Sequence, residues 1–298
     1  MKKLIIIFLF AGTILAQNAG NTGLSFLKVG FGPRNIAMGD LGVVESNDLT
    51  SLYYNPALLA DNKSAQIFVS HNDWIQDVRS ELFGASFKLF GLPFAFGLNT
   101  TSINEIEIRQ KPGEALSTFN AYYFFGSLST GFYVTEKLKA GATVRFINEN
   151  LFSDEAHGWG FDLGLAYNEI FDELNLGIAL RNLGSMNKLR NVETTLPTDL
   201  RVGLSYPILV KSIKTDITLV SGYQKYLDVD NNHIHLGTEL LYDKFLAIRA
   251  GYVTGFEAKS FSGGLGLIWN NIKFDYAFTP FEYNLGSAHT ISVSYLFN

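Results

Sequence analysis

The end of the chain shows the pattern that organises most of it. Large apolar side chains take every second position, at Ile291, Val293, Tyr295 and Phe297, and small or polar residues lie between them. Successive side chains of a strand point to opposite faces, so this pattern predicts a strand with one apolar and one polar face. An aromatic C-terminal strand is typical of a transmembrane β-barrel, and we expect Tyr295 and Phe297 to lie where the barrel closes.

The same alternation recurs through the chain from about residue 65. It predicts an all-β fold, a transmembrane barrel of about 14 antiparallel strands, each near the ~9–11 residues that a tilted membrane strand needs. The expected strands are 65–72, 81–90, 93–102, 119–132, 137–148, 158–168, 173–182, 198–206, 215–224, 233–242, 244–254, 260–269, 272–279 and 288–297.

The connections between these strands alternate in length. Short ones fall near residues 91, 135, 243 and 270, whereas longer polar ones are expected around 72–80, 103–118, 149–157, 183–197, 225–232 and 280–287. Outer-membrane barrels have short periplasmic turns and longer outer loops. An even number of strands then leaves both ends of the chain in the periplasm.

The N-terminal residues 1–62 do not show the strand alternation and fall into two segments. Residues 1–16 carry two lysines, a short apolar run and a final alanine, which predicts a cleaved signal peptide and export to the outer membrane of a Gram-negative-type bacterium. Residues 17–62 are glycine-rich and not alternating, so we expect a plug segment there and the barrel over 63–298. A helical turn is expected over 33–38, and a short helix over 48–59 with Asp48 as its N-cap.

Composition agrees with a barrel. Hydrophobic residues make up 47% and charged residues only 17%, below the roughly 25% of soluble domains, yet no apolar run after residue 16 is long enough for a membrane helix. The chain has no cysteine and a net charge of −5, which excludes disulfides, thiolate metal sites and a basic nucleic-acid surface.

Charged residues in the predicted strands fall on the polar face, where a barrel places its lumen. A soluble β-sandwich also alternates, but the aromatic loading of the apolar face, the strand length and the signal peptide favour the barrel. The predicted lumen-facing charges are Arg145, Asp162, Arg181, Arg201, Glu239, Arg249, Lys273 and Asp275.

No set of residues suggests an active site, and we expect neither an enzyme nor a cofactor. His233 and His235 share one face of a strand and could hold a metal, but without a third nearby ligand we favour polar lining of the lumen. The glycines at 263, 264 and 266 lie inside an expected strand and could ease packing beside a plug or at a bend.

One group of plug residues carries a family resemblance. The candidate plug motif is Gly30, Gly32, Arg34, Gly39, Asp40, Asn55, Pro56 and Ala57, in which Arg34 and Asp40 could pair with the charged inner wall. The segments 26–39 and 54–57, with later segments 71–75 and 181–184, resemble the PorV/PorQ family of outer-membrane proteins. That family is in turn similar to FadL-type barrels, with fourteen strands and an N-terminal plug.

The resemblance implies two alternative functions. In the first, the barrel is a non-enzymatic component of protein secretion of the type IX kind or of surface attachment, and its partners are secretion proteins or cargo. In the second, it transports hydrophobic small molecules as FadL-like proteins do. The charged and small polar residues of the expected inner face argue against an apolar route, but Phe26, Phe31 and the aromatics at 122–125 could line one. Trp74 and Ile75, apolar in an expected outer loop, are candidate partner contacts or membrane-interface anchors. Outer-membrane lipid and the barrel-assembly machinery are expected partners in either case.

Overall fold

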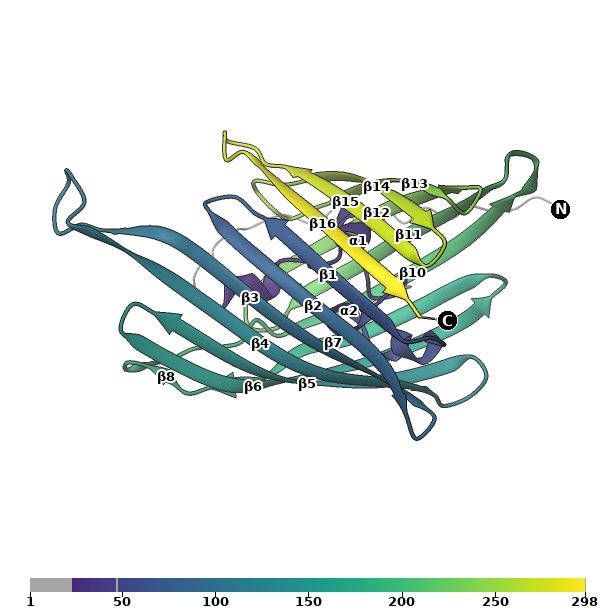
Figure 1. Cartoon of the computed structure of the whole chain (residues 1–298), viewed down its shortest axis with the longest axis horizontal. Coiled ribbons are helices and arrows are strands. Elements are labelled where there is room, and N and C mark those ends of the chain that lie inside the picture. The colour runs from purple at the N-terminus through teal and green to yellow at the C-terminus, as the bar shows by residue number, and fades with distance from the viewer. Residues whose placement is uncertain (1–22, 47, 298) are drawn as a thin grey trace.

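The computed structural model describes residues 23–46 and 48–297 and shows a closed antiparallel barrel (Figure 1). The strands follow one another around the ring, and the first, β1, pairs with the last, β16. The prediction of a closed, roughly fourteen-stranded barrel is confirmed. The predicted signal peptide, residues 1–16, and the first part of the predicted plug lie outside the described residues.

Each barrel strand overlaps one predicted range, although several extend beyond it. They are β1 (Gln66–Asp73), β2 (Val78–Leu89), β3 (Leu92–Ile108), β4 (Ser117–Tyr133), β5 (Leu138–Leu151), β6 (Asp154–Phe171), β7 (Leu174–Met186), β10 (Asp199–Val210), β11 (Thr215–Tyr226), β12 (Asn231–Tyr242), β13 (Leu246–Val253), β14 (Phe261–Trp269), β15 (Ile272–Pro280) and β16 (Ser287–Leu296). A small hairpin, β8 (Lys188–Leu189) with β9 (Val192–Glu193), lies within the expected loop 183–197. A 3-10 turn, η3 (Lys211–Ile213), joins β10 to β11.

The barrel closes through its C-terminal strand. Tyr295 pairs with Ile67 of β1 on one side and with Ile272 of β15 on the other. The Phe297 amide donates to the Ala65 carbonyl at 2.9 Å. Both aromatic rings lie on the outer surface and contact each other at 4.9 Å between centroids.

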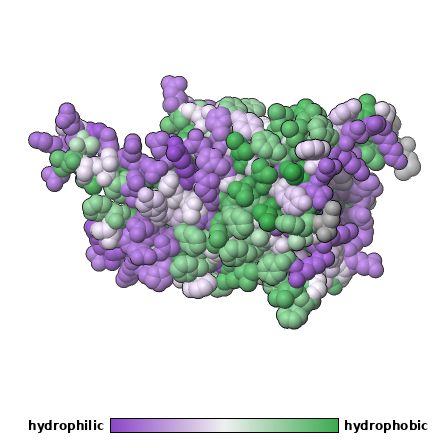
Figure 2. Space-filling model, viewed as in Figure 1, coloured by the Kyte–Doolittle hydropathy of each residue, from purple (hydrophilic) through white to green (hydrophobic). Residues whose placement is uncertain are grey.

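Apolar side chains cover the outside of the barrel and charged side chains the inside. On the face shown in Figure 2, hydrophobic residues gather over the middle of the barrel, with hydrophilic surface at both ends. All the predicted lumen-facing charges are buried except Lys273, which is 13% exposed. This distribution avoids the cost of about 2–4 kcal/mol for a lysine or arginine at the lipid face near the midplane.

Several strands run further than a membrane crossing requires. β3, β4 and β6 have 17, 17 and 18 residues, and the β3–β4 hairpin projects beyond the rest of the barrel (Figure 1). The predicted loops 103–118 and 149–157 were therefore too long, because pairing continues to Ile108 and Leu151. The end of the barrel that carries this hairpin is called the outer end below.

The N-terminal segment lies inside the barrel. It forms η1 (Ser25–Lys28), α1 (Pro33–Ala37), α2 (Ser51–Tyr54) and η2 (Pro56–Asp61). The prediction of one helix over 48–59 with Asp48 as N-cap was wrong, because Asn55 takes an extended conformation before Pro56 and splits it in two. In the described part of the chain no helix is long and apolar enough to span a membrane.

Candidate plug and ligand-binding site

The plug lies against a belt of inward-facing glycines. A Cβ built on any of these glycines would meet a plug atom at 2.0–2.6 Å, closer than real Cβ atoms come. The belt supplies one glycine from each neighbouring strand from β4 to β14: Gly131, Gly141, Gly164, Gly177, Gly203, Gly222, Gly237, Gly251 and Gly264. The wall therefore leaves room for the plug backbone of residues 37–44 and 55–57.

The predicted plug motif builds the plug's internal turns. Asn55 donates through Nδ2 to the carbonyls of Val43 and Leu165, at 2.7 and 3.1 Å, and its Oδ1 accepts from the Ala57 amide. Asn55 thus ties two plug segments to β6 and caps η2, which starts at Pro56. Gly39, with φ 77°, approaches the Leu236 carbonyl so closely that a side chain would clash.

Two more motif glycines give space to polar side chains. A Cβ on Gly30 would lie 2.2 Å from Asp40 Oδ1, which accepts from the Tyr54 hydroxyl at 2.6 Å. A Cβ on Gly32 would lie 2.7 Å from the Thr50 side chain. Both glycines therefore allow neighbouring plug segments to pack closely, because a larger residue at either position would clash.

One network of ion pairs starts and ends on the plug. Its charges alternate in the order Arg34, Glu239, Arg249, Asp275, Lys273, Asp48. Arg34 binds Glu239 at 2.7 Å, Arg249 binds Asp275 at 2.6 Å, and Lys273 lies 3.4 Å from Asp48. Three cations balance three carboxylates, so the Arg34–Asp48 network joins plug and wall without net charge.

Asp48 stays ionised in this setting. Burial raises the pKa of its carboxyl, but Lys273 and hydrogen bonds from Thr50 outweigh burial and hold that pKa below its ordinary value. The Thr50 amide donates to Asp48 Oδ1 at 2.9 Å. Asp48 thus links the wall to the plug turn before α2, although it does not cap that helix.

A second network lies on the opposite part of the wall. It comprises Arg145, Asp162, Arg181, Asp199, Arg201 and the plug carboxylate Asp40. Arg145 binds Asp162 at 2.7 Å, and Arg201 lies 3.8 Å from the Asp40 carboxylate. The Arg181 guanidinium stacks over the Tyr53 ring of α2 at 4.2 Å. The Arg145–Asp40 network therefore holds a second side of the plug.

An aromatic slot lies beside this network towards the outer end. Phe26 of η1 stacks on Tyr123 and Phe125 of β4, with centroids 5.1 and 6.4 Å apart. Phe31 meets Phe125 edge-on at 5.8 Å. The slot belongs to an apolar core that also contains Leu27. The inner wall is therefore apolar in this sector, where the aromatics at 122–125 were candidates to line an apolar route.

The apolar lining continues above the slot. Phe119, Ala121, Tyr123 and Phe125 alternate along β4 and so share the inner face. Isoleucines of β3 pair with this row, Ile103 with Ala121 and Ile106 with Phe119. The projecting hairpin thus presents a half-buried apolar strip that leads from the outside to Phe26.

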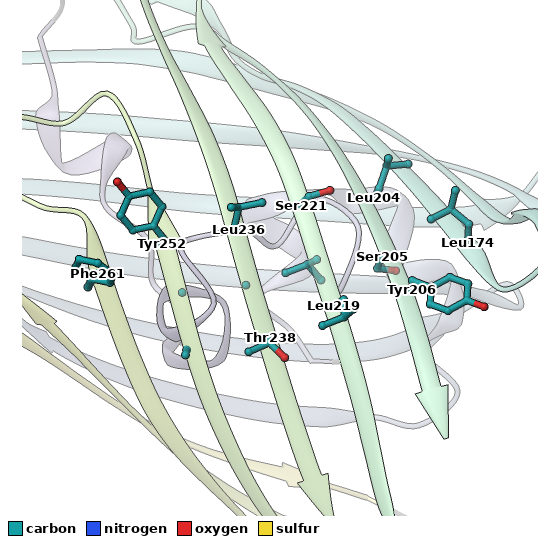
Figure 3. A pocket seen from close by; sticks show the side chains of 14 residues that line it. Leu174, Leu204, Ser205, Tyr206, Leu219, Ser221, Leu236, Thr238, Tyr252 and Phe261 are labelled. Atoms are coloured by element: carbon teal, nitrogen blue, oxygen red, sulfur yellow. The ribbon is translucent and has the colours of Figure 1, made fainter. Parts of the chain in front are cut away.

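Cavities occur on both sides of the wall. A groove of about 610 Å³ lies over β10–β13 and is lined by outward side chains such as Leu204, Leu219, Leu236 and Tyr252 (Figure 3). Since these side chains belong to the apolar outer surface of the barrel, this groove faces lipid. A second cavity, between plug and wall near Asp40 and Lys259, has only about 20 Å³, enough for about one water.

The predicted loop contact Trp74 packs within the protein. The Trp74 ring packs edge-on against the Phe281 ring, with centroids 5.1 Å apart. Lys259 Nζ lies over the Trp74 ring, 5.3 Å from its centroid. Trp74 therefore connects three outer loops. Ile75 is half-buried beside it.

The two histidines line the lumen. His235 Nδ1 contacts the Gly39 carbonyl at 2.6 Å, and His233 Nδ1 contacts the Thr254 carbonyl at 2.9 Å. Over residues 23–46 and 48–297, no cluster of three or more histidine, cysteine or acidic residues has the arrangement of a metal site.

Comparison with known proteins supports the fold. No family model and no curated protein matches the chain. Among solved structures it is similar to the toluene transporter TodX of Pseudomonas putida, with a TM-score of 0.68, 16% identity, and coverage of 90% of this chain and 98% of that one. The match to the toluene transporter TbuX of Ralstonia pickettii has a TM-score of 0.63 and 16% identity, and it covers 90% of this chain and 99% of that one. The match to a Pseudomonas aeruginosa FadL homologue has a TM-score of 0.54 and 13% identity, and it covers 91% of this chain and 100% of that one.

These neighbours place the chain among FadL- and TodX-like barrel folds. The resemblance to PorV and PorQ proteins receives no support from the comparisons, because no family model matches.

Proposed function

We propose that the protein is an outer-membrane channel that takes up small hydrophobic molecules. The observation that carries this proposal is the aromatic slot, in which Phe26 of the plug stacks on Tyr123 and Phe125 of the wall. A single ring of the protein's own chain fills a site whose walls suit a single ring of a ligand. The similar structures TodX and TbuX are toluene transporters, which agrees with such a ligand.

The plug has one firmly held part and one part held mainly by apolar contacts. The glycine belt and both ion networks hold residues 34–57, whereas η1 contributes its buried apolar side chains, Phe26 and Leu27. Backbone contacts of η1 are fewer, such as the Tyr53 hydroxyl donating to the Leu27 carbonyl at 2.6 Å. We infer that a hydrophobic ligand displaces Phe26 while the rest of the plug stays in place.

The apolar strip on β3 and β4 supplies a route from outside to this slot. A hydrophobic molecule leaves water when it contacts Ile106 and Phe119 and gains further burial as it approaches Phe26. Such transport needs no catalytic group. Docking of secretion proteins or cargo at the outer loops, including Trp74 and Ile75, stays a prediction that no observation here favours.

Uptake of radiolabelled toluene by whole cells tests the proposal. Cells that produce the protein should take up toluene faster at low concentration than cells that lack it. Phe26→Ala removes one phenyl ring and so leaves a space of about the size of one ring. It should raise the initial rate, whereas Phe26→Trp should lower it.

Phe90→Ala is the matched control, because this ring lies 93% exposed in the β2–β3 turn at the other end of the barrel. It should leave uptake unchanged. Equal uptake by cells with and without the wild-type protein would contradict the proposed function.

A further inference from the structure

Several buried polar atoms in and beside the Arg145–Asp40 network have no hydrogen-bond partner. In the part of the chain that the structure describes, every buried side-chain nitrogen or oxygen that lacks a hydrogen bond, except Gln66 Oε1, belongs to this region of the wall. These atoms are Arg145 Nε, Arg181 Nε and Nη1, Asp199 Oδ1, Arg201 Nε and Nη2, His233 Nε2 and His235 Nε2. Native proteins pair most buried polar groups, and such a cluster indicates a bound water or ion.

Two guanidinium groups converge at the centre of this cluster. Arg181 Nε and Arg201 Nε lie 4.0 and 3.4 Å from the same oxygen, Asp199 Oδ1. Both arginines also reach the plug, since Arg181 Nη2 donates to the Leu27 carbonyl at 3.5 Å and Arg201 Nη1 to the Asp40 carbonyl at 3.2 Å. Arg181 Nη1 and Arg201 Nη2 remain as unpartnered donors on side chains that are 0% and 1% exposed.

The charges around these atoms indicate whether a bound ion would be an anion or a cation. The network itself is neutral, but Lys259 interacts electrostatically with Asp40 and Arg201 and adds positive charge to the region. A metal cation at His233 and His235 would meet Arg201 and Lys259, which interact electrostatically with both rings, so the cluster favours an anion.

We propose that Arg181 and Arg201 bind a monovalent anion of halide size beside the plug. The anion accepts from Arg181 Nη1 and Arg201 Nη2, the donors that the protein leaves unpaired. Because the same two arginines bind the carbonyls of Leu27 and Asp40, the bound anion stabilises the closed position of η1 relative to α1. This inference does not depend on which molecule the channel carries.

Bromide is the probe, because its anomalous scattering locates it in a crystal. Crystals of the wild-type protein soaked in sodium bromide should show a bromide within hydrogen-bonding distance of both guanidinium groups. Arg201→Gln should lose this peak, and Arg190→Gln, which changes a 67% exposed outer-loop arginine, should keep it. Absence of bromide between Arg181 and Arg201 in the wild type, or only an ordered water there, would overturn the proposal.

Thermal unfolding provides a second readout in solution. An anion that binds only the folded state raises Tm as its concentration increases. At constant ionic strength, replacing gluconate by chloride should raise the Tm of the wild type and of Arg190→Gln, but not of Arg201→Gln. The same chloride dependence in all three proteins would contradict the site, and if Arg201→Gln does not fold, the bromide experiment on the wild type decides.

Discussion

Replacing Gly141 by valine is expected to prevent the plug from seating. A Cβ at Gly141 would lie 2.4 Å from the Pro56 carbonyl carbon and 2.5 Å from the Ala57 nitrogen, and both are backbone atoms that cannot rotate away. Overpacking a core usually costs about 1–3 kcal/mol of stability. We expect the clash between the new valine side chain and the plug backbone to cost at least that much, because backbone atoms cannot move aside as a side chain can. Gly141→Val should therefore expel this part of the plug and open the lumen to ions.

Conductance across a planar lipid bilayer measures this effect. We expect the wild type to pass little current and Gly141→Val to form open channels, or to fail to assemble if the plug is needed for folding. The matched control is Gly126→Val, because a Cβ at Gly126 on neighbouring β4 comes no closer than 3.5 Å to Leu98. Indistinguishable conductance and yield for the two variants would show that the glycine belt does not hold the plug.

Replacing Arg249 by leucine is expected to cause the largest loss of stability among the charge changes. Arg249 binds Glu239 at 2.5 Å and Asp275 at 2.6 Å, and its side chain is 1% exposed. Without Arg249, the buried carboxylates of Glu239 and Asp275 both lose a cationic partner. Breaking a buried pair in this way costs about 3–5 kcal/mol.

Urea unfolding in lipid vesicles, followed by tryptophan fluorescence, measures the free energy of unfolding of this variant. The control is Arg190→Leu, which breaks an exposed pair with Asp154 and should cost about 0–1 kcal/mol. Similar losses in both proteins would mean that the Arg34–Asp48 network contributes no more than a surface ion pair.

Much of the barrel could be predicted because alternation has a direct physical cause. Over most of strands such as β6 and β16, exposed outward side chains alternate with buried inward ones, so apolar and polar or small residues alternate in the sequence. Charges such as Arg145 and Arg249 were placed in the lumen by the same rule, since lipid excludes them.

The sequence indicated that Arg34 and Asp40 could pair with the inner wall, and both do. Their individual partners could not be predicted, because these lie in distant segments. Nothing local shows that Arg34 meets Glu239, 205 positions away. The sequence named Phe26 and the aromatics at 122–125 as possible lining of an apolar route. It did not show which of them face the lumen, because Tyr122–Phe125 are aromatic on both faces of β4. The lengths of β3 and β6 were underestimated because pairing continues beyond the membrane, where lipid no longer imposes a strict apolar alternation.

The proposed channel depends on a site in the lumen for a small hydrophobic molecule, covered by Phe26. Anomalous scattering from crystals of the wild-type protein soaked in bromobenzene can locate such a site. We expect a bromine peak between Tyr123 and Phe125, with the Phe26 ring displaced and α1 unmoved. Bromine confined to the outer groove near Leu204 and Leu236, with Phe26 still stacked on Tyr123, would contradict it.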